Sequence, residues 1–160
     1  MSLFPGCIAA HRGVMRREVT KVGPMQPGPR FISAAATAAT VERALEFGDE
    51  PAAIRHLTEA ISRLIQAPEH SKIPLDVLEA PDPIRDSRYE TLIATAFAYA
   101  LSRRGEMPLA WMTDVEPVPT EWLWDGDGAS EEYRDFVRSH TPHIFREKNI
   151  LTRERNWATR

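Results

Sequence analysis

Two histidines three positions apart have the clearest metal-ligand spacing in this chain. His140 and His143 are separated by Thr141 and Pro142, and two imidazoles at this spacing can meet one zinc ion. A structural zinc site needs four protein ligands, and the sequence supplies no third ligand in register. Histidines near the end of a helix are equally explained by ordinary capping. We therefore expect neither a metal site nor a cofactor.

Five acidic residues in the C-terminal third could bind a divalent cation. They are Asp114, Glu116, Glu121, Asp125 and Asp127. Their spacing matches no motif for magnesium-assisted phosphoryl transfer. Residues 125–128 begin like a calcium loop, but Ala129 stands where a third oxygen ligand belongs. The sequence favours a solvated acidic loop.

Nucleophilic catalysis has no assembled candidate. The sequence contains no nucleophile elbow, no phosphate-binding loop and no dinucleotide-binding glycine motif. The only cysteine is Cys7, so no disulfide can form within the chain, and a reducing compartment is indicated. No signal peptide and no run of about 18 apolar residues is present. We expect a cytoplasmic protein that is not an enzyme and does not enter a membrane.

Charge is unevenly distributed along the chain. The 160 residues have a formal net charge of −3, but residues 1–30 hold five Arg or Lys against one acid, and residues 31–160 hold fifteen against twenty-two. Binding to duplex DNA needs clustered positive charge that releases counterions from the phosphates. The acidic body therefore disfavours a nucleic-acid surface, and the basic arm offers weak contacts only.

Helical periodicity dominates residues 31–151. Apolar residues recur at intervals of three and four, most clearly between Asp86, a helix cap, and Gly105, a helix stop. Residues 31–47 and 49–68 predict two antiparallel helices joined at Gly48. Residues 72–83 hold three prolines and leave room for one helical turn at most.

Shorter helices are expected in the C-terminal part. Ser130 caps a helix with one face formed by Tyr133, Phe136, Val137 and His140. No period-two run of β-branched residues is present. The sequence predicts a compact all-α domain over residues 31–151, with about five to seven helices and no sheet. Residues 1–30 are expected to be a disordered, basic, Pro- and Gly-rich arm, and residues 152–160 a solvated tail.

The tryptophans concentrate toward the C-terminus. They are Trp111, Trp122, Trp124 and Trp157. In one interpretation the indoles pin irregular chain to the core. In the other, one or two of them face outward as anchors of a protein interface, with the neighbouring carboxylates as a rim that suits a basic partner.

Several short motifs resemble a known family. They are PDPIRDSRYETLIA at residues 81–94, PLAW at 108–111, WLW at 122–124 and TPHIF at 141–145, followed by Asn149 and Ile150. Together they make residues 41–151 resemble the C-terminal domain of small actinobacterial transcriptional regulators of the antitoxin type. In that family an Xre-like helix-turn-helix domain usually precedes this domain, and the neighbouring gene often encodes a nucleotidyltransferase-like toxin.

The resemblance implies the toxin-binding half of such a protein. Residues 1–30 stand where the DNA-binding domain is expected and are too few for an Xre module. The resemblance also implies structural roles for Asp86 as a cap, for Tyr89 and Trp111 as core anchors, and for Thr141 and Pro142 as a helix start. No catalytic residue follows from it.

We therefore expect a non-enzymatic protein-binding domain that neutralises a cognate toxin. The predicted partner surface combines the tryptophans and acids of one stretch: Trp111, Asp114, Glu116, Glu121, Trp122, Trp124, Asp125 and Asp127. The alternative is a small DNA-associated transcriptional regulator that uses the basic arm. A third possibility is an enzyme of unrecognised type.

Overall fold

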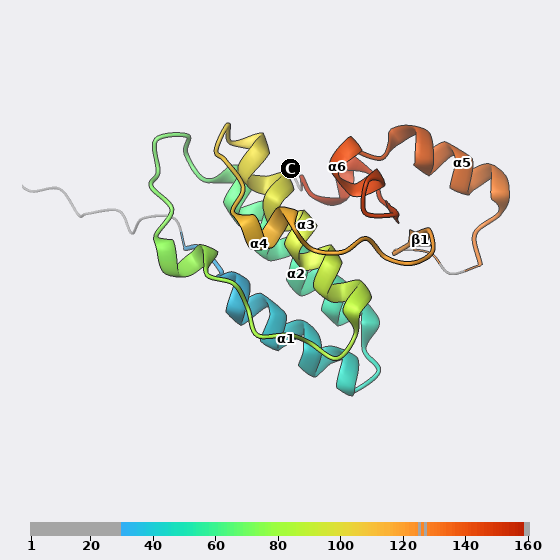
Figure 1. Ribbon diagram of the computed structural model, residues 1–160, viewed down its shortest axis with the longest axis horizontal. Coiled ribbons are helices and arrows are strands. Elements are labelled where there is room, and N and C mark those ends of the chain that lie inside the picture. Colours follow the sequence, from blue (N-terminus) through green and yellow to red (C-terminus); the bar gives the residue numbers. More distant parts are fainter. Residues whose placement is uncertain (1–29, 125, 127, 159–160) are drawn as a thin grey trace, which may run out of the picture.

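The computed structural model describes residues 30–124, 126 and 128–158. The α-helices of this part are α1 (Ala34–Glu46), α2 (Glu50–Gln66), α3 (Ser87–Arg103), α4 (Ala110–Thr113), α5 (Glu131–His140) and α6 (His143–Arg146) (Figure 1). Two 3-10 turns, η1 (Leu75–Leu78) and η2 (Glu154–Asn156), and two short strands, β1 (Trp122–Leu123) and β2 (Ile150–Leu151), complete it. The predicted all-α class is confirmed, and the number of helices falls within the expected range.

Helices α1 and α2 form an antiparallel hairpin because local signals set their ends. Ser33 Oγ accepts a hydrogen bond from the Ala36 amide at the start of α1. Asp49 Oδ1 accepts one from the Ala52 amide at the start of α2. Between the helices, Gly48 has a φ of 71°, the left-handed conformation that ends α1. The two helices therefore lie side by side (Figure 1).

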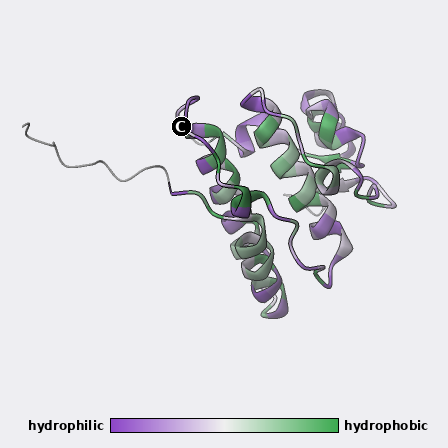
Figure 2. Ribbon diagram, turned by 60° about the vertical axis from the view of Figure 1, so that its left-hand side comes forward, coloured by the Kyte–Doolittle hydropathy of each residue, from purple (hydrophilic) through white to green (hydrophobic). Residues whose placement is uncertain are grey.

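Helix α3 runs through the core, as its apolar pattern predicts. Residues 91–101 are all buried, and α3 contacts α1, α2, α4 and α6. A helix covered on every side needs apolar or small residues all round, and α3 alternates alanine and threonine with large residues such as Leu92 and Phe97. Green, hydrophobic stretches run along the helices in Figure 2, whereas purple, hydrophilic residues gather at helix ends and loops. Burial of each large side chain contributes about 1.5–3 kcal/mol.

Arg104 fastens the end of α3 to the chain that follows α2. Its side chain is only 3% exposed and pairs with Glu106 at 2.8 Å. The guanidinium also donates hydrogen bonds to the carbonyls of Leu64, Ala67 and Ser71 at 3.1, 2.8 and 2.9 Å. Carbonyls in the last turn of a helix have no partner within the helix. A single buried cation therefore caps α2 and positions the connector that leads to η1.

The fold differs in one detail from the expected domain without a sheet. Strands β1 and β2 pair in parallel, with Trp122 opposite Ile150 and Leu123 opposite Leu151. The Trp122 amide donates to the Asn149 carbonyl at 2.8 Å. Strands of two residues are too short to show the alternation that reveals a strand in a sequence. The pairing joins the chain after α4 to the chain after α6.

The C-terminal boundary predicted at residue 151 is corrected by the structure. Thr152 and Trp157 are fully buried, at 0% exposure. The Trp157 ring stacks on Phe145 with 5.1 Å between centroids, and its Nε1 donates a hydrogen bond to Thr152 Oγ1 at 3.1 Å. Because η2 turns the chain back, the indole reaches the core. The predicted arm lies outside the described residues, apart from the exposed Arg30.

Candidate protein-binding surface

The tryptophans of the predicted partner surface pack in the interior of the domain. Trp122 is 7% exposed and Trp124 is 3% exposed. Trp111 is half-buried, and its Nε1 donates a hydrogen bond to the Leu78 carbonyl at 3.0 Å. The expectation that these rings face a partner is therefore corrected for Trp122 and Trp124, which are buried, whereas Trp111 stays partly exposed. Burying an indole removes a large apolar area from water, and residues of α3 contact the rings of Trp111 and Trp122.

Trp122 lies between two residues at the start of α3. Its ring meets Tyr89 edge to face, with 5.2 Å between centroids. The Arg88 guanidinium lies 4.9 Å from the centroid of the same indole. The Tyr89 hydroxyl donates to Glu50 Oε1 at 2.8 Å, and burial together with this carboxylate raises the pKa of Tyr89 well above its usual value. Tyr89 is thus a core anchor, as the family resemblance implies.

The described acidic residues of the predicted surface lie in solvent. Asp114, Glu116 and Glu121 are all exposed, and they stand on the segment between α4 and β1. Asp125 and Asp127 lie outside the described residues. The structure therefore separates the two halves of the prediction, since the indoles pack inward and the carboxylates stay outside.

Two residues after α6 hold this acidic segment in place. Lys148 Nζ donates hydrogen bonds to the carbonyls of Thr113 and Val115 at 2.8 and 2.5 Å. The Asn149 side-chain amide donates to the Val118 carbonyl at 2.8 Å. Asn149 has a φ of 59°, a left-handed conformation that asparagine tolerates. Side chains far along the chain thus fix the backbone, and the carboxylates of Asp114 and Glu116 stay exposed at the surface.

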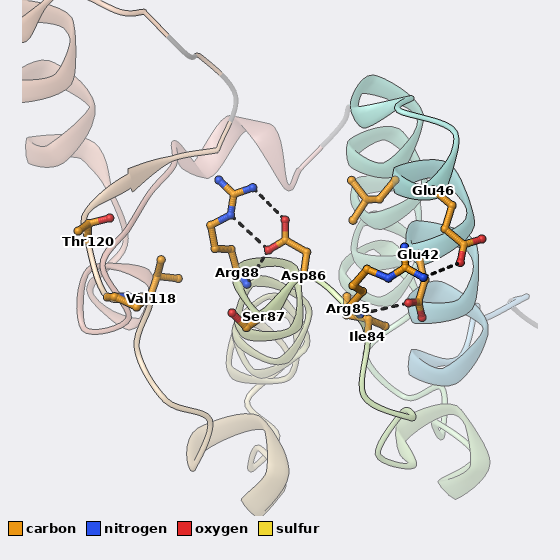
Figure 3. Close-up of a pocket in the computed structure, with 11 residues that line it drawn as sticks. Glu42, Glu46, Ile84, Arg85, Asp86, Ser87, Arg88, Val118 and Thr120 are labelled. Atoms are coloured by element: carbon orange, nitrogen blue, oxygen red, sulfur yellow. Dashed lines mark hydrogen bonds and ion pairs between the residues drawn. The ribbon is translucent and has the colours of Figure 1, made fainter.

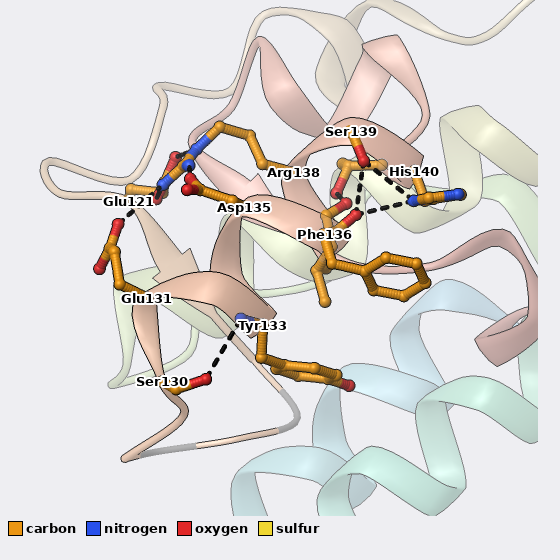
Figure 4. A network of polar contacts seen from close by, with 11 residues as sticks. Glu121, Ser130, Glu131, Tyr133, Asp135, Phe136, Arg138, Ser139 and His140 are labelled. Atoms are coloured by element: carbon orange, nitrogen blue, oxygen red, sulfur yellow. Dashed lines mark hydrogen bonds and ion pairs between the residues drawn. The ribbon is translucent and has the colours of Figure 1, made fainter.

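Helix α5 is joined to the acidic segment by an arginine. Arg138 donates to both oxygens of Glu121, at 2.6 and 2.9 Å, and it also pairs with Asp135 (Figure 4). These hydrogen bonds hold the pKa of the Glu121 carboxyl below its usual value and raise the pKa of Arg138. Sequence reasoning missed the pair because the two residues are 17 positions apart.

Another side of α5 has three aromatic side chains. The ring of Phe136 lies 6.4 Å from that of Tyr133 and 4.3 Å from that of His140, between centroids. Phe136 is 48% exposed, and of the residues in α5 only Val137 is buried. Figure 4 shows the Tyr133 and Phe136 rings projecting away from the side that carries Arg138. The sequence places these residues on one face, but periodicity alone does not show whether that face is covered.

A cleft of about 610 Å³ lies beside the start of α3, between α1 and residues 118–120 (Figure 3). The Arg85 amide donates to Glu42 at 3.1 Å, and the Arg85 guanidinium lies 3.8 Å from Glu46. Arg88 donates to Asp86 at 2.9 and 3.2 Å, which holds the pKa of the Asp86 carboxyl below its usual value. A carboxylate stabilised in this way is a poor proton acceptor at neutral pH.

The described residues contain no group of three or more His, Cys, Asp and Glu side chains that could hold a metal ion. The two histidines with ligand spacing have separate neighbours. His140 Nδ1 lies 2.7 Å from the Phe136 carbonyl oxygen, and His143 Nδ1 lies 3.5 Å from a Glu147 carboxylate oxygen. Nor does any helix within this part of the chain have the length and apolarity to cross a membrane.

No protein-family model, curated protein or solved structure matches the chain. Its function is therefore inferred from its own surface. Its described part has exposed carboxylates between α4 and β1, and an adjoining helix, α5, on which Phe136 and His140 are exposed.

Proposed function

We propose that this chain is a non-enzymatic protein-binding domain, an antitoxin-like neutraliser of a cognate nucleotidyltransferase-like toxin. The observation that carries the proposal is the acidity of one stretch of surface. Residues 114–135 contain eight acidic residues and one basic residue, Arg134. The acids of this stretch that the structure describes are all exposed: Asp114, Glu116, Glu121, Glu131, Glu132 and Asp135.

Such a surface suits a partner with a basic active-site cleft. An enzyme that handles nucleotides or RNA holds phosphates with arginine and lysine side chains. Carboxylates on a fixed backbone can occupy the positions of those phosphates and so close the cleft without any chemistry. Complementary charge also accelerates the encounter of two proteins and disfavours wrong partners.

The internal pairing of charges beside α3 supports binding rather than catalysis. General acid–base chemistry needs a titratable group with a pKa near the working pH. Asp86 has its pKa held low by Arg88, which moves this carboxyl away from that range. Glu42 likewise accepts a hydrogen bond from the Arg85 backbone amide, and the Arg85 guanidinium lies 3.8 Å from Glu46.

A second candidate function rests on the basic residues 1–30. They carry five Arg or Lys against one acid, which fits a DNA-associated transcriptional regulator that reaches phosphate groups with its arm. The acidic surface weighs against it, because that surface repels the same phosphates. This alternative expects retardation of duplex DNA that weakens steeply as salt is raised.

The test is co-expression with the toxin encoded by the neighbouring gene. We expect the chain to restore growth to cells that produce the toxin and to co-purify with it in a complex that salt weakens. The double reversal Asp114→Lys with Glu116→Lys should raise the Kd by at least about tenfold, or about 1.4 kcal/mol.

The matched control reverses two exposed acids on the connector between α2 and α3, Glu69→Lys with Asp76→Lys. It adds the same charge elsewhere, so it should change the Kd far less. Absence of binding by the wild-type chain contradicts the proposal. So does an equal loss of affinity in both double variants.

A further inference from the structure

Helix α5 buries only part of the apolar side that its sequence predicts. It has ten residues and begins at the Ser130 cap, but it buries only Val137, which packs against Leu123 and Leu151. Isolated helices of this length are marginal in water, so packing usually covers their apolar side. The rest of that side, which we name the aromatic face, is only partly covered by the described residues, since Tyr133 packs against the Val137 cluster whereas Phe136 and His140 are exposed. It consists of Tyr133, Phe136 and His140.

The aromatic face is one continuous strip centred on Phe136. Tyr133 and His140 flank the Phe136 ring at 6.4 and 4.3 Å between centroids. Arg153 lies 5.7 Å from the Tyr133 ring centroid, so one end of the strip already has a neighbour. Phe136 is 48% exposed and His140 is also exposed, whereas Tyr133 is half-buried. Aromatic side chains that lose their water on association are enriched at the energetic centres of protein interfaces.

Two sets of contacts attach α5 to the rest of the domain. The Val137 cluster fixes one side of α5, and the two hydrogen bonds from Arg138 to Glu121 fix another. These contacts orient the helix before any partner arrives. A surface held in its bound geometry loses less conformational entropy on association.

We infer that the aromatic face is the apolar centre of an interface with a basic protein surface, an inference that rests on the function proposed above. Charge decides the occupant. Residues 114–135 hold eight acids against Arg134 alone. Arg138 pairs with Glu121, Glu131 and Asp135, and Asp114, Glu116 and Glu132 also lie exposed. A nucleic acid or an anionic membrane would bring negative charge to this surface, and so would residues 31–160 of a second copy, which hold fifteen Arg or Lys against twenty-two acids. A basic protein, whose apolar side chains meet Phe136 while its cations meet the carboxylates, satisfies both features.

The closing experiment measures the Kd of the full chain for the toxin encoded by the neighbouring gene, by calorimetry. Phe136→Ala should raise the Kd at least about tenfold, while the melting temperature and the helical circular dichroism of the free chain stay close to wild type. Phe136→Leu, which keeps an apolar side chain, should lose less. The chain offers a matched control in Phe47, which is 82% exposed at the tip of the α1–α2 hairpin. Phe47→Ala should leave the Kd unchanged.

The outcomes separate this inference from the proposed function. Toxin that binds Phe136→Ala as tightly as wild type overturns the aromatic face and leaves the proposed function standing. Equal losses in Phe136→Ala and Phe47→Ala also overturn it. A wild-type chain that does not bind the toxin overturns both. Analytical ultracentrifugation of the chain alone tests whether a second copy binds the aromatic face instead. A dimer that Phe136→Ala dissociates would assign the aromatic face to that second copy and overturn the inference.

Discussion

The indole rings of Trp124 and Trp157 stack with 4.8 Å between their centroids and 12° between their planes. The stack joins the residue after β1 to the residue after η2. The Phe145 ring also stacks on Trp157, with 5.1 Å between centroids. Aromatic pairs add to the stabilisation that comes from burial itself. The C-terminal segment is therefore part of the core.

Removal of the Trp157 indole should destabilise the whole domain. Trp157 is fully buried, so Trp157→Ala loses apolar burial and leaves a cavity, at a cost of about 3–5 kcal/mol in the free energy of unfolding. Urea denaturation measures this change. Arg155→Ala, at an exposed position of η2, is the control and should unfold like wild type. Unchanged stability in Trp157→Ala would show that the segment does not pack as described.

The central helix gives a second prediction. Leu92 is 0% exposed within α3, and Leu92→Ala should lower the free energy of unfolding by roughly 2–5 kcal/mol. Arg103 in the same helix pairs with Glu154, but both side chains are about half exposed. Arg103→Ala should therefore cost less than about 1 kcal/mol. Similar midpoints for the two variants in thermal denaturation would contradict the placement of α3.

Trp122 should behave as a core residue and not as an interface anchor. Its ring contacts Tyr89 and Arg88 inside the domain, so Trp122→Ala should lower stability by about 3–5 kcal/mol. Affinity for the proposed partner should fall only in proportion to the unfolded fraction, unlike the loss expected for Phe136→Ala. Melting temperature and Kd measured on the same preparations distinguish the two behaviours. A Trp122→Ala variant that stays folded but binds more weakly would instead place the Trp122 indole in the interface.

Asp86 should contribute an acid-sensitive part of the stability. Hydrogen bonds from Arg88 lower its pKa from 3.8 in the folded state, so the contribution is present above pH 3.8 and is lost as the pH falls through the lower folded value. Asp86→Asn keeps an oxygen that can cap α3 but removes the charge. The stability gap between wild type and Asp86→Asn, measured by urea denaturation, should therefore narrow in acid. A gap that does not depend on pH would mean that the ion pair is already screened by solvent.

Tyr99 should make the domain sensitive to alkali. Burial, and then the nearby Glu154 carboxylate, raise its pKa from 10.0 to about 12. The unfolded chain loses this proton first, so the contribution of Tyr99 is complete below pH 10.0 and is lost as the pH rises toward 12. Tyr99→Phe should reduce the decline in stability over this interval. Tyrosinate absorbance of the folded protein checks the same shift, and ionisation of all tyrosines near pH 10.0 would contradict it.

The sequence by itself determined the elements that depend on neighbouring residues. Asp49, Asp86 and Ser130 each cap a helix through a hydrogen bond that spans two or three residues. Gly48 and Gly105 end helices because both have a φ of 71°. The apolar period of residues 86–104 likewise identified α3. Such signals are readable because caps, stops and helical faces involve positions at most a few residues apart.

Only the tertiary structure decided which of these faces are covered. Contacts between segments far apart in the chain bury Trp122 and Trp157 in the core and pair Glu121 with Arg138. The opposite outcome held for Phe136, whose helical face looks like a core stripe and yet stays 48% exposed. Burial depends on what the rest of the chain places against a residue, and that information does not reside in the spacing of its own helix.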